Sequence, residues 1–182
     1  KDDAVMQCLL QEVRRKARDF NSQAIANTLN AMAKLDYKDD AVMRCLLHEA
    51  QQKANNFNAQ EIANTLNAMA KLDYKNDAVM RCLLQEGRRK ARDFNAQDIA
   101  NTLNAMAKVD YKNDAVMQCL LQEGRRKARD FNAQNIANTL NAMAKLDYKD
   151  DAVMQCLLQE GRRKARDFNA QAIANTLNAM SK

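Results

Sequence analysis

Residues 57–70 read FNAQEIANTLNAMA, and nearly the same stretch occurs four more times along the 182-residue chain. A fixed period of roughly 20 to 50 residues is typical of a repeat array. Neither end resembles a polar capping repeat, so we expect an excerpt of a longer array. The phenylalanine that opens each stretch lies 37 residues after the previous one, at Phe20, Phe57, Phe94, Phe131 and Phe168. We therefore expect a single array with repeats at about 1–37, 38–74, 75–111, 112–148 and 149–182.

The composition favours helices. The chain has no proline and only three glycines, which leaves little room for long loops. No apolar run approaches the roughly 20 residues that a membrane-spanning helix needs, so no membrane association is expected. The formal net charge of +6 is spread over all the repeats, and it permits a polyanionic partner without requiring one.

One cysteine occurs in each repeat, always before two leucines. Metal sites need clustered ligands and disulfides need partners, and this spacing offers neither. We expect each cysteine to be a small buried side chain, and we expect no metal site and no cofactor. Unpaired thiols also favour a reducing intracellular compartment. The cysteines are Cys8, Cys45, Cys82, Cys119 and Cys156.

Two amphipathic helices are predicted in each period of the sequence. Asn58 is a suitable N-cap, and apolar residues such as Ile62 and Leu66 then recur at helical spacing. This pattern predicts a first helix, the A helix, at about 59–72. A short turn, DYKN, leads to a second helix, the B helix, at about 77–93. The predicted fold class is therefore all-α, an α-solenoid of stacked antiparallel helical pairs.

The polar side of each A helix carries a regular stripe, which we call a rib. A glutamine, two asparagines and a lysine follow the spacing i, i+4, i+7 and i+11, which places them on one face. An ordinary solvated face is one interpretation. The other is a ligand-positioning surface, because asparagine is a poor mid-helix residue and amides offer both donors and acceptors. The members are Gln23, Asn27, Asn30, Lys34; Gln60, Asn64, Asn67, Lys71; Gln97, Asn101, Asn104, Lys108; Gln134, Asn138, Asn141, Lys145; and Gln171, Asn175, Asn178, Lys182.

The residue after the rib glutamine varies more than its neighbours. It is the third residue of the predicted A helix, where Glu completes a capping box, Asp suits the helix dipole and Ala is tolerated. The alternative is that this residue selects a ligand while the rib holds it, as in proteins that read one base per repeat. These candidate ligand-selecting residues are Ala24, Glu61, Asp98, Asn135 and Ala172.

Basic residues end most of the predicted B helices, as in the stretch RRKAR at 125–129. A solvated face compatible with the helix dipole explains them. General attraction for a phosphate backbone is the alternative.

The phrase FNxQxIANTLNAMAKLxY resembles the A-helix signature of the octotricopeptide and heptatricopeptide repeat families. That resemblance covers essentially the whole chain, and it implies helical pairs of 37 to 38 residues that bind single-stranded RNA, about one nucleotide per repeat. It also implies an organelle or a bacterial cytoplasm as the location. Many family members have tryptophan after the leucine of the signature, whereas this chain has asparagine, as at Asn67.

We therefore predict an RNA-binding module that recognises single-stranded RNA along the ribs. The alternative is a protein- or peptide-binding scaffold that uses the same amides as backbone clamps. The sequence contains no repeated acid pair with a nucleophile, no phosphate-binding loop and no metal-ligand cluster, so no enzymatic activity is expected.

Overall fold

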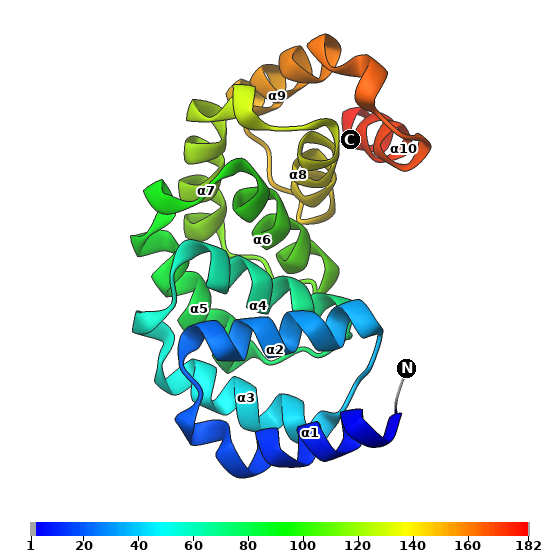
Figure 1. The fold of residues 1–182 in the computed structure, drawn as a ribbon. Coiled ribbons are helices and arrows are strands. Elements are labelled where there is room, and N and C mark those ends of the chain that lie inside the picture. The colour runs from blue at the N-terminus through cyan, green and yellow to red at the C-terminus, as the bar shows by residue number, and fades with distance from the viewer. Residues whose placement is uncertain (1–2, 182) are drawn as a thin grey trace.

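The computed structural model describes residues 3–181, and every regular element within them is helical (Figure 1). The fold predicted from the sequence, an α-solenoid of helical pairs, is confirmed. The B helices are α1 (Asp3–Lys16), α3 (Asp40–Gln52), α5 (Asp77–Arg89), α7 (Asp114–Arg126) and α9 (Asp151–Arg163). The A helices are α2 (Ser22–Leu35), α4 (Ala59–Lys71), α6 (Ala96–Lys108), α8 (Ala133–Lys145) and α10 (Ala170–Met180). One turn of 3-10 helix follows each B helix, at Ala17–Asp19, Ala54–Asn56, Ala91–Asp93, Ala128–Asp130 and Ala165–Asp167.

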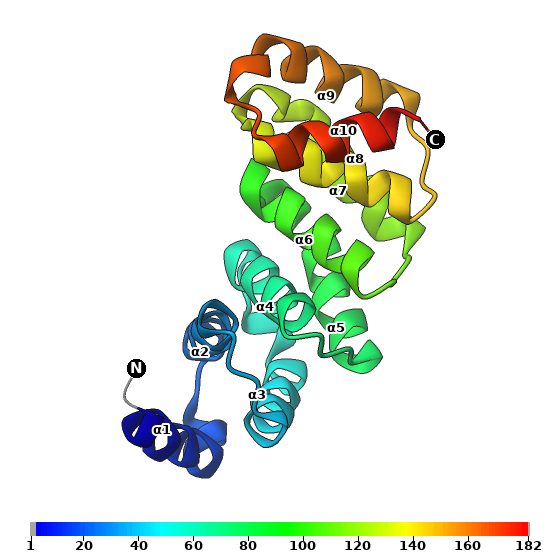
Figure 2. The same cartoon turned by 90° about the vertical axis from the view of Figure 1, so that its right-hand side faces the viewer.

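The helices form two layers that run the length of the array (Figures 1 and 2). The A layer consists of the five A helices, each packed along its neighbours, and the B layer consists of the five B helices. Contacts between neighbouring B helices are far less extensive than those between neighbouring A helices. The array therefore bends with the A layer on its inner side, which gathers the ribs of successive repeats.

Asparagine starts every A helix. The Oδ1 atom of Asn58 accepts a hydrogen bond from the backbone N–H of Glu61 at 2.9 Å, and the same cap recurs in the other repeats. Such a cap satisfies one of the four N–H groups that a helix start leaves without a partner. The B helices start with asparagine or aspartate caps, at Asp39, Asn76, Asn113 and Asp150.

An aspartate in the left-handed conformation ends the first four A helices. Asp110 has a φ of 50°, and the N–H of the next residue, Tyr111, donates to the carbonyl of Met106 at 2.9 Å. This is the hydrogen bond of a Schellman motif, in which glycine is the usual left-handed residue. Aspartate tolerates this conformation better than most side chains do. The other three are Asp36, Asp73 and Asp147.

The core lies between the two layers. Three phenylalanines of the repeated stretch, Phe57, Phe94 and Phe131, are fully buried there. The prediction that the cysteines are buried is wrong: Cys8 is exposed, and the other four are only half-buried. They lie on the B helices, which contact their neighbours in the layer less extensively than the A helices do.

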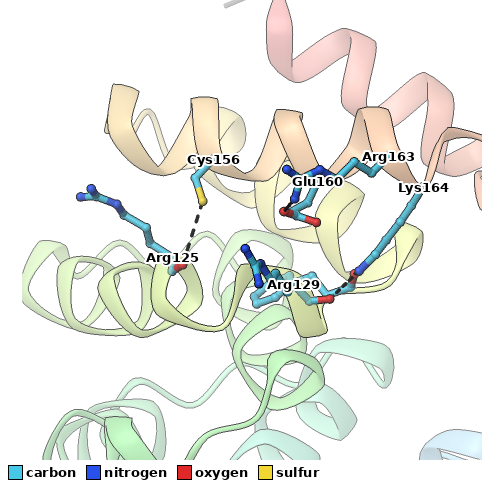
Figure 3. Close-up of polar contacts among 7 residues, drawn as sticks. Arg125, Arg129, Cys156, Glu160, Arg163 and Lys164 are labelled. Atoms are coloured by element: carbon cyan, nitrogen blue, oxygen red, sulfur yellow. Dashed lines mark hydrogen bonds and ion pairs between the residues drawn. The ribbon is translucent and has the colours of Figure 1, made fainter.

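A lysine after the B helix ties each repeat to the previous one. The Nζ atom of Lys164 donates to the backbone carbonyls of Arg129 and Phe131, at 2.6 and 2.5 Å (Figure 3). Lys53, Lys90 and Lys127 make the same pair of bonds, so four repeat junctions carry this contact, which we call the lysine clamp. The interpretation of RRKAR as a solvated basic face is therefore wrong for this lysine. The sequence does distinguish this lysine from the arginines beside it, because repeat two replaces the flanking arginines but keeps Lys53.

Candidate functional site

The ribs lie in the A layer, and their ends are its most accessible parts. The rib glutamines at 23, 60, 97, 134 and 171 are exposed, as are the lysines at 34, 71, 108 and 145. Lys182 lies outside the described residues. The middle of each rib is less exposed than its ends in the interior repeats. There, most of the asparagines are half-buried, and Asn141 is only 8% exposed. Close packing of the A helices covers them.

The end repeats show which way the rib asparagines face. Asn27 is exposed in α2, which has no described A helix before it, whereas its counterpart Asn175 in α10 is half-buried. The first asparagine of a rib therefore faces the preceding A helix. The second asparagine shows the reverse, because Asn178 is exposed in α10 and Asn30 is half-buried in α2. Each seam between A helices is thus bordered by amides from both sides.

Hydrogen bonds within a rib leave part of each amide available. The Nε2 atom of Gln134 donates to Oδ1 of Asn138 at 2.8 Å, and Gln171 donates in the same way to Asn175 at 3.1 Å. The glutamine keeps its carbonyl oxygen as an acceptor, and the asparagine keeps its amino group as a donor. A rib with this bond therefore still presents both acceptors and donors to a ligand.

The candidate ligand-selecting position lies at the start of the A helix, beside the seam. Glu61 is half-buried, while Asp98, Asn135 and Ala172 are 5%, 7% and 1% exposed. Ala172 is covered although no described A helix follows α10, so this position faces the preceding A helix. The structure therefore brings this position together with the first rib asparagine at one seam. In the middle of the array, the side chain at this position has little exposed surface.

The capping role of this position is confirmed in two repeats. The carboxylates of Glu61 and Asp98 accept hydrogen bonds from the backbone N–H groups of Asn58 and Asn95, at 3.0 and 3.3 Å, which completes capping boxes. Burial raises the pKa of the Asp98 carboxyl above its usual range, although the bond from Asn95 and the charge of Lys127 act in the opposite direction. Asp98 is therefore a buried carboxyl whose pKa is raised mainly because burial removes the carboxylate from water.

The arginines lie on the outer surface of the B layer. Arg125, Arg126 and Arg129 are exposed, as are their counterparts in repeats three and five. Part of this charge is paired, since Arg126 contacts Glu123 at 2.5 Å and Arg163 contacts Glu160 at 2.5 Å (the latter in Figure 3). The arginine of each pair is exposed, whereas the glutamates, Glu123 and Glu160, are only 7% exposed. This face is therefore less strongly positive than the sequence RRKAR suggests.

Neither a metal-ligand cluster nor a membrane-spanning helix occurs in residues 3–181. In that part of the chain, no three His, Cys, Asp or Glu residues are grouped so that they could hold a metal ion. None of the helices described there is long and apolar enough to cross a bilayer.

Comparison with known proteins adds one finding. No curated protein matches the chain. A family model does match, over residues 1–182, and it describes the RNA-editing substrate-binding complex 6 protein. This name supports the RNA-related helical repeat class that the sequence predicted, while the octotricopeptide or heptatricopeptide type stays a prediction. Because the match spans every residue, the chain belongs to the RNA-editing substrate-binding complex 6 protein family.

Proposed function

We propose that this chain is a binding module, not an enzyme, that holds single-stranded RNA along the ribs of the A layer, with about one nucleotide per repeat. The observation that carries the proposal is the alignment of five amide ribs on the inner side of the array in a member of an RNA-editing complex family. Packed helices lie about 8–10 Å apart, so the ribs recur at a regular interval along the array. Helical repeat proteins that read one base per repeat use a similar row of side chains.

The rib supplies the contacts that such a ligand needs. Its exposed lysine is suited to a phosphate oxygen, and its amides are suited to base edges, which present donors and acceptors together. The recessed asparagines border the seams, so a base edge inserted between two A helices would meet amides from both. No stacking aromatic occupies the rib, so hydrogen bonding to base edges carries the recognition.

Selection among bases is the finer part of the proposal. Glu61 and Asp98 are acceptor-only when ionised and suit a base edge with two donors, such as that of guanine, whereas Asn135 suits an edge of mixed polarity. Glu61 is more exposed than Asp98 and Asn135, whose nearly buried side chains offer little surface to a ligand. Selection should therefore be stronger at repeat two than at repeats three and four.

The first experiment is enrichment of a randomised single-stranded RNA pool on the purified chain, at low and at moderate salt. Enrichment of a short motif supports the proposal, and equal retention of all polyanions, or of none, contradicts it. Exchanging Glu61→Gln and, separately, Asn135→Asp then tests the selector. Each exchange should alter the preferred base at one ligand position and leave the others unchanged. An unaltered motif would leave these residues with the capping role alone.

Salt dependence tests whether the ribs carry the phosphate contacts. The variant Lys71→Gln/Lys108→Gln should weaken binding to all RNA sequences and reduce the slope of log K against log salt by about 0.7 per lost contact. Arg44→Gln/Arg81→Gln is the matched control, because both arginines are exposed on the B layer and the charge change is the same. A larger change in the control would move the binding surface to the B layer.

A protein partner is the second candidate, because the name of the family describes a complex. The amide seams could then clamp a peptide backbone. Absence of RNA enrichment would favour this candidate.

A further inference from the structure

An arginine and an aspartate stand next to each other in most of the 3-10 turns that follow the B helices. In the middle of the array these are Arg92 with Asp93 and Arg129 with Asp130, and all four side chains are exposed. Within residues 3–181, none of these four side chains makes a hydrogen bond or an ion pair. We call the row of these charged pairs along the edge of the array the junction strip.

The backbone beneath each pair is fixed by the lysine clamp. Lys127 donates to the carbonyl of Arg92 at 2.7 Å, and Lys164 donates to that of Arg129 at 2.6 Å (Figure 3). The N–H of each aspartate donates to a carbonyl within its own turn, both at 2.9 Å. A partner that binds the strip would therefore have to order side chains only, which lowers the entropic cost of binding.

Repeat two shows that the junction forms without these charges. Asn55 and Asn56 replace the arginine and the aspartate together, and both are exposed. The 3-10 turn is still present there, and Lys90 still donates to the carbonyl of Asn55 at 2.8 Å. Construction of the turn and of the clamp therefore does not account for the charged pairs in the other repeats.

The mixture of charges limits what the strip can bind. An RNA backbone is negative throughout, so Asp93 and Asp130 would repel it. A second copy of this chain is also unsuitable, because residues 86–93 contain four basic and two acidic residues, and two such surfaces would repel each other. A guanidinium group matches a carboxylate with two parallel hydrogen bonds, and an aspartate accepts from a basic side chain.

We infer that the junction strip binds an acidic polypeptide of mixed charge, in which carboxylates outnumber basic side chains. Its carboxylates pair with Arg92 and Arg129, and its basic side chains pair with Asp93 and Asp130. Repeat two leaves a neutral gap in the strip, so repeats three and four carry the contact. This surface differs from the ribs of the A layer, and the inference does not depend on RNA binding.

Fluorescence anisotropy of a labelled helical peptide tests the inference. The probe contains about 20 residues, which span about 30 Å, with roughly two glutamates for each lysine. The variant Arg92→Asn/Asp93→Asn/Arg129→Asn/Asp130→Asn copies the turn of repeat two into repeats three and four without changing the net charge. It should weaken peptide binding on the order of 10-fold, because two bidentate sites are lost.

The converse variant fills the neutral gap in repeat two. Asn55→Arg/Asn56→Asp also leaves the net charge unchanged, and it should strengthen peptide binding about threefold. A misfolded chain could not produce such a gain. The inference is overturned if the wild type does not bind the peptide, or if either variant binds it as tightly as the wild type.

Two further variants separate a polypeptide from RNA and the strip from the ribs, at moderate salt where long-range attraction is screened. Asp93→Asn/Asp130→Asn should weaken peptide binding, because the lysines of the peptide lose their partners. Tighter binding of both the peptide and a single-stranded RNA would show a general anion surface and overturn the inference. Lys71→Gln/Lys108→Gln should bind the peptide like the wild type, and a loss there would place the peptide on the ribs instead. Failure of RNA enrichment would leave all these outcomes unaffected.

Discussion

The central A helices and the central B helices each contain 13 residues, yet the two layers pack differently. Neighbouring A helices contact each other along their length, whereas neighbouring B helices meet over a much smaller surface. Small residues explain the close approach. Ala63 and Ala105 are both 0% exposed, and the end repeats show that they face the seam between α4 and α6, since Ala174 and Ala31 are the exposed counterparts. Packing at the seams, more than the length of the helices, therefore determines the curvature of the array and the arrangement of the ribs.

The largest effect is expected from filling a seam of the A layer. Ala105→Leu inserts three carbons between α6 and α4 and should destabilise the chain by about 2–3 kcal/mol, because a close-packed site cannot expand without strain. Ala115→Leu is the matched control, since the same exchange lies at an exposed position of α7 and should change stability by less than about 0.5 kcal/mol. Urea unfolding measures both. Equal effects would contradict the close packing proposed for the seam between α4 and α6.

The lysine clamp should come next. Lys127→Met keeps much of the aliphatic stem but removes hydrogen bonds of 2.7 and 2.5 Å to the carbonyls of Arg92 and Phe94, so a loss of about 1–2 kcal/mol is expected. Lys108→Met removes a lysine from the exposed end of a rib and should cost less than about 0.5 kcal/mol. If the two variants unfold at the same urea concentration, the clamp does not stabilise the junction.

A smaller effect of opposite sign is expected at Gly124 in the B layer. A Cβ atom there would lie 3.4 Å from Cζ of Phe131 and 3.7 Å from Cγ2 of Ile99, and repeat two already accommodates Ala50 at this position. Gly124→Ala should therefore stabilise the chain by about 0.5–1 kcal/mol, because alanine loses less backbone entropy in a helix. A lower melting temperature would show that the ring of Phe131 cannot shift to make room for the added Cβ atom.

The smallest effect should be a pH dependence at Asp98. Burial raises the pKa of this carboxyl, so the folded chain binds a proton more readily than the unfolded chain. The stabilisation from that proton is present below the unfolded pKa and is lost as the pH rises through the raised folded value. Asp98→Asn cannot titrate, so the stability of the wild type relative to this variant should fall from acidic to neutral pH. A difference independent of pH would contradict the buried-carboxyl interpretation.

The sequence determined the local structure of this protein. A strict 37-residue period, asparagine caps and apolar spacing are enough to specify helical pairs, because each depends on residues within one or two turns of each other. The observed α4, Ala59–Lys71, lies within the predicted 59–72, and the predicted 77–93 became α5 followed by one turn of 3-10 helix. The candidate rib residues were also identified from spacing alone, and their role in binding remains a prediction.

Only the tertiary structure decided what happens between repeats. The half-exposure of Cys82, the near burial of Asn141 and the two bonds of Lys127 all depend on how closely helices from neighbouring repeats approach. Those helices are separated by a full period of the sequence, and periodicity fixes which face is apolar but leaves open how far apart the faces lie. Side-chain volume at the seams sets that distance. The alanines of the A layer, rather than the polar residues of the ribs themselves, therefore position the ribs.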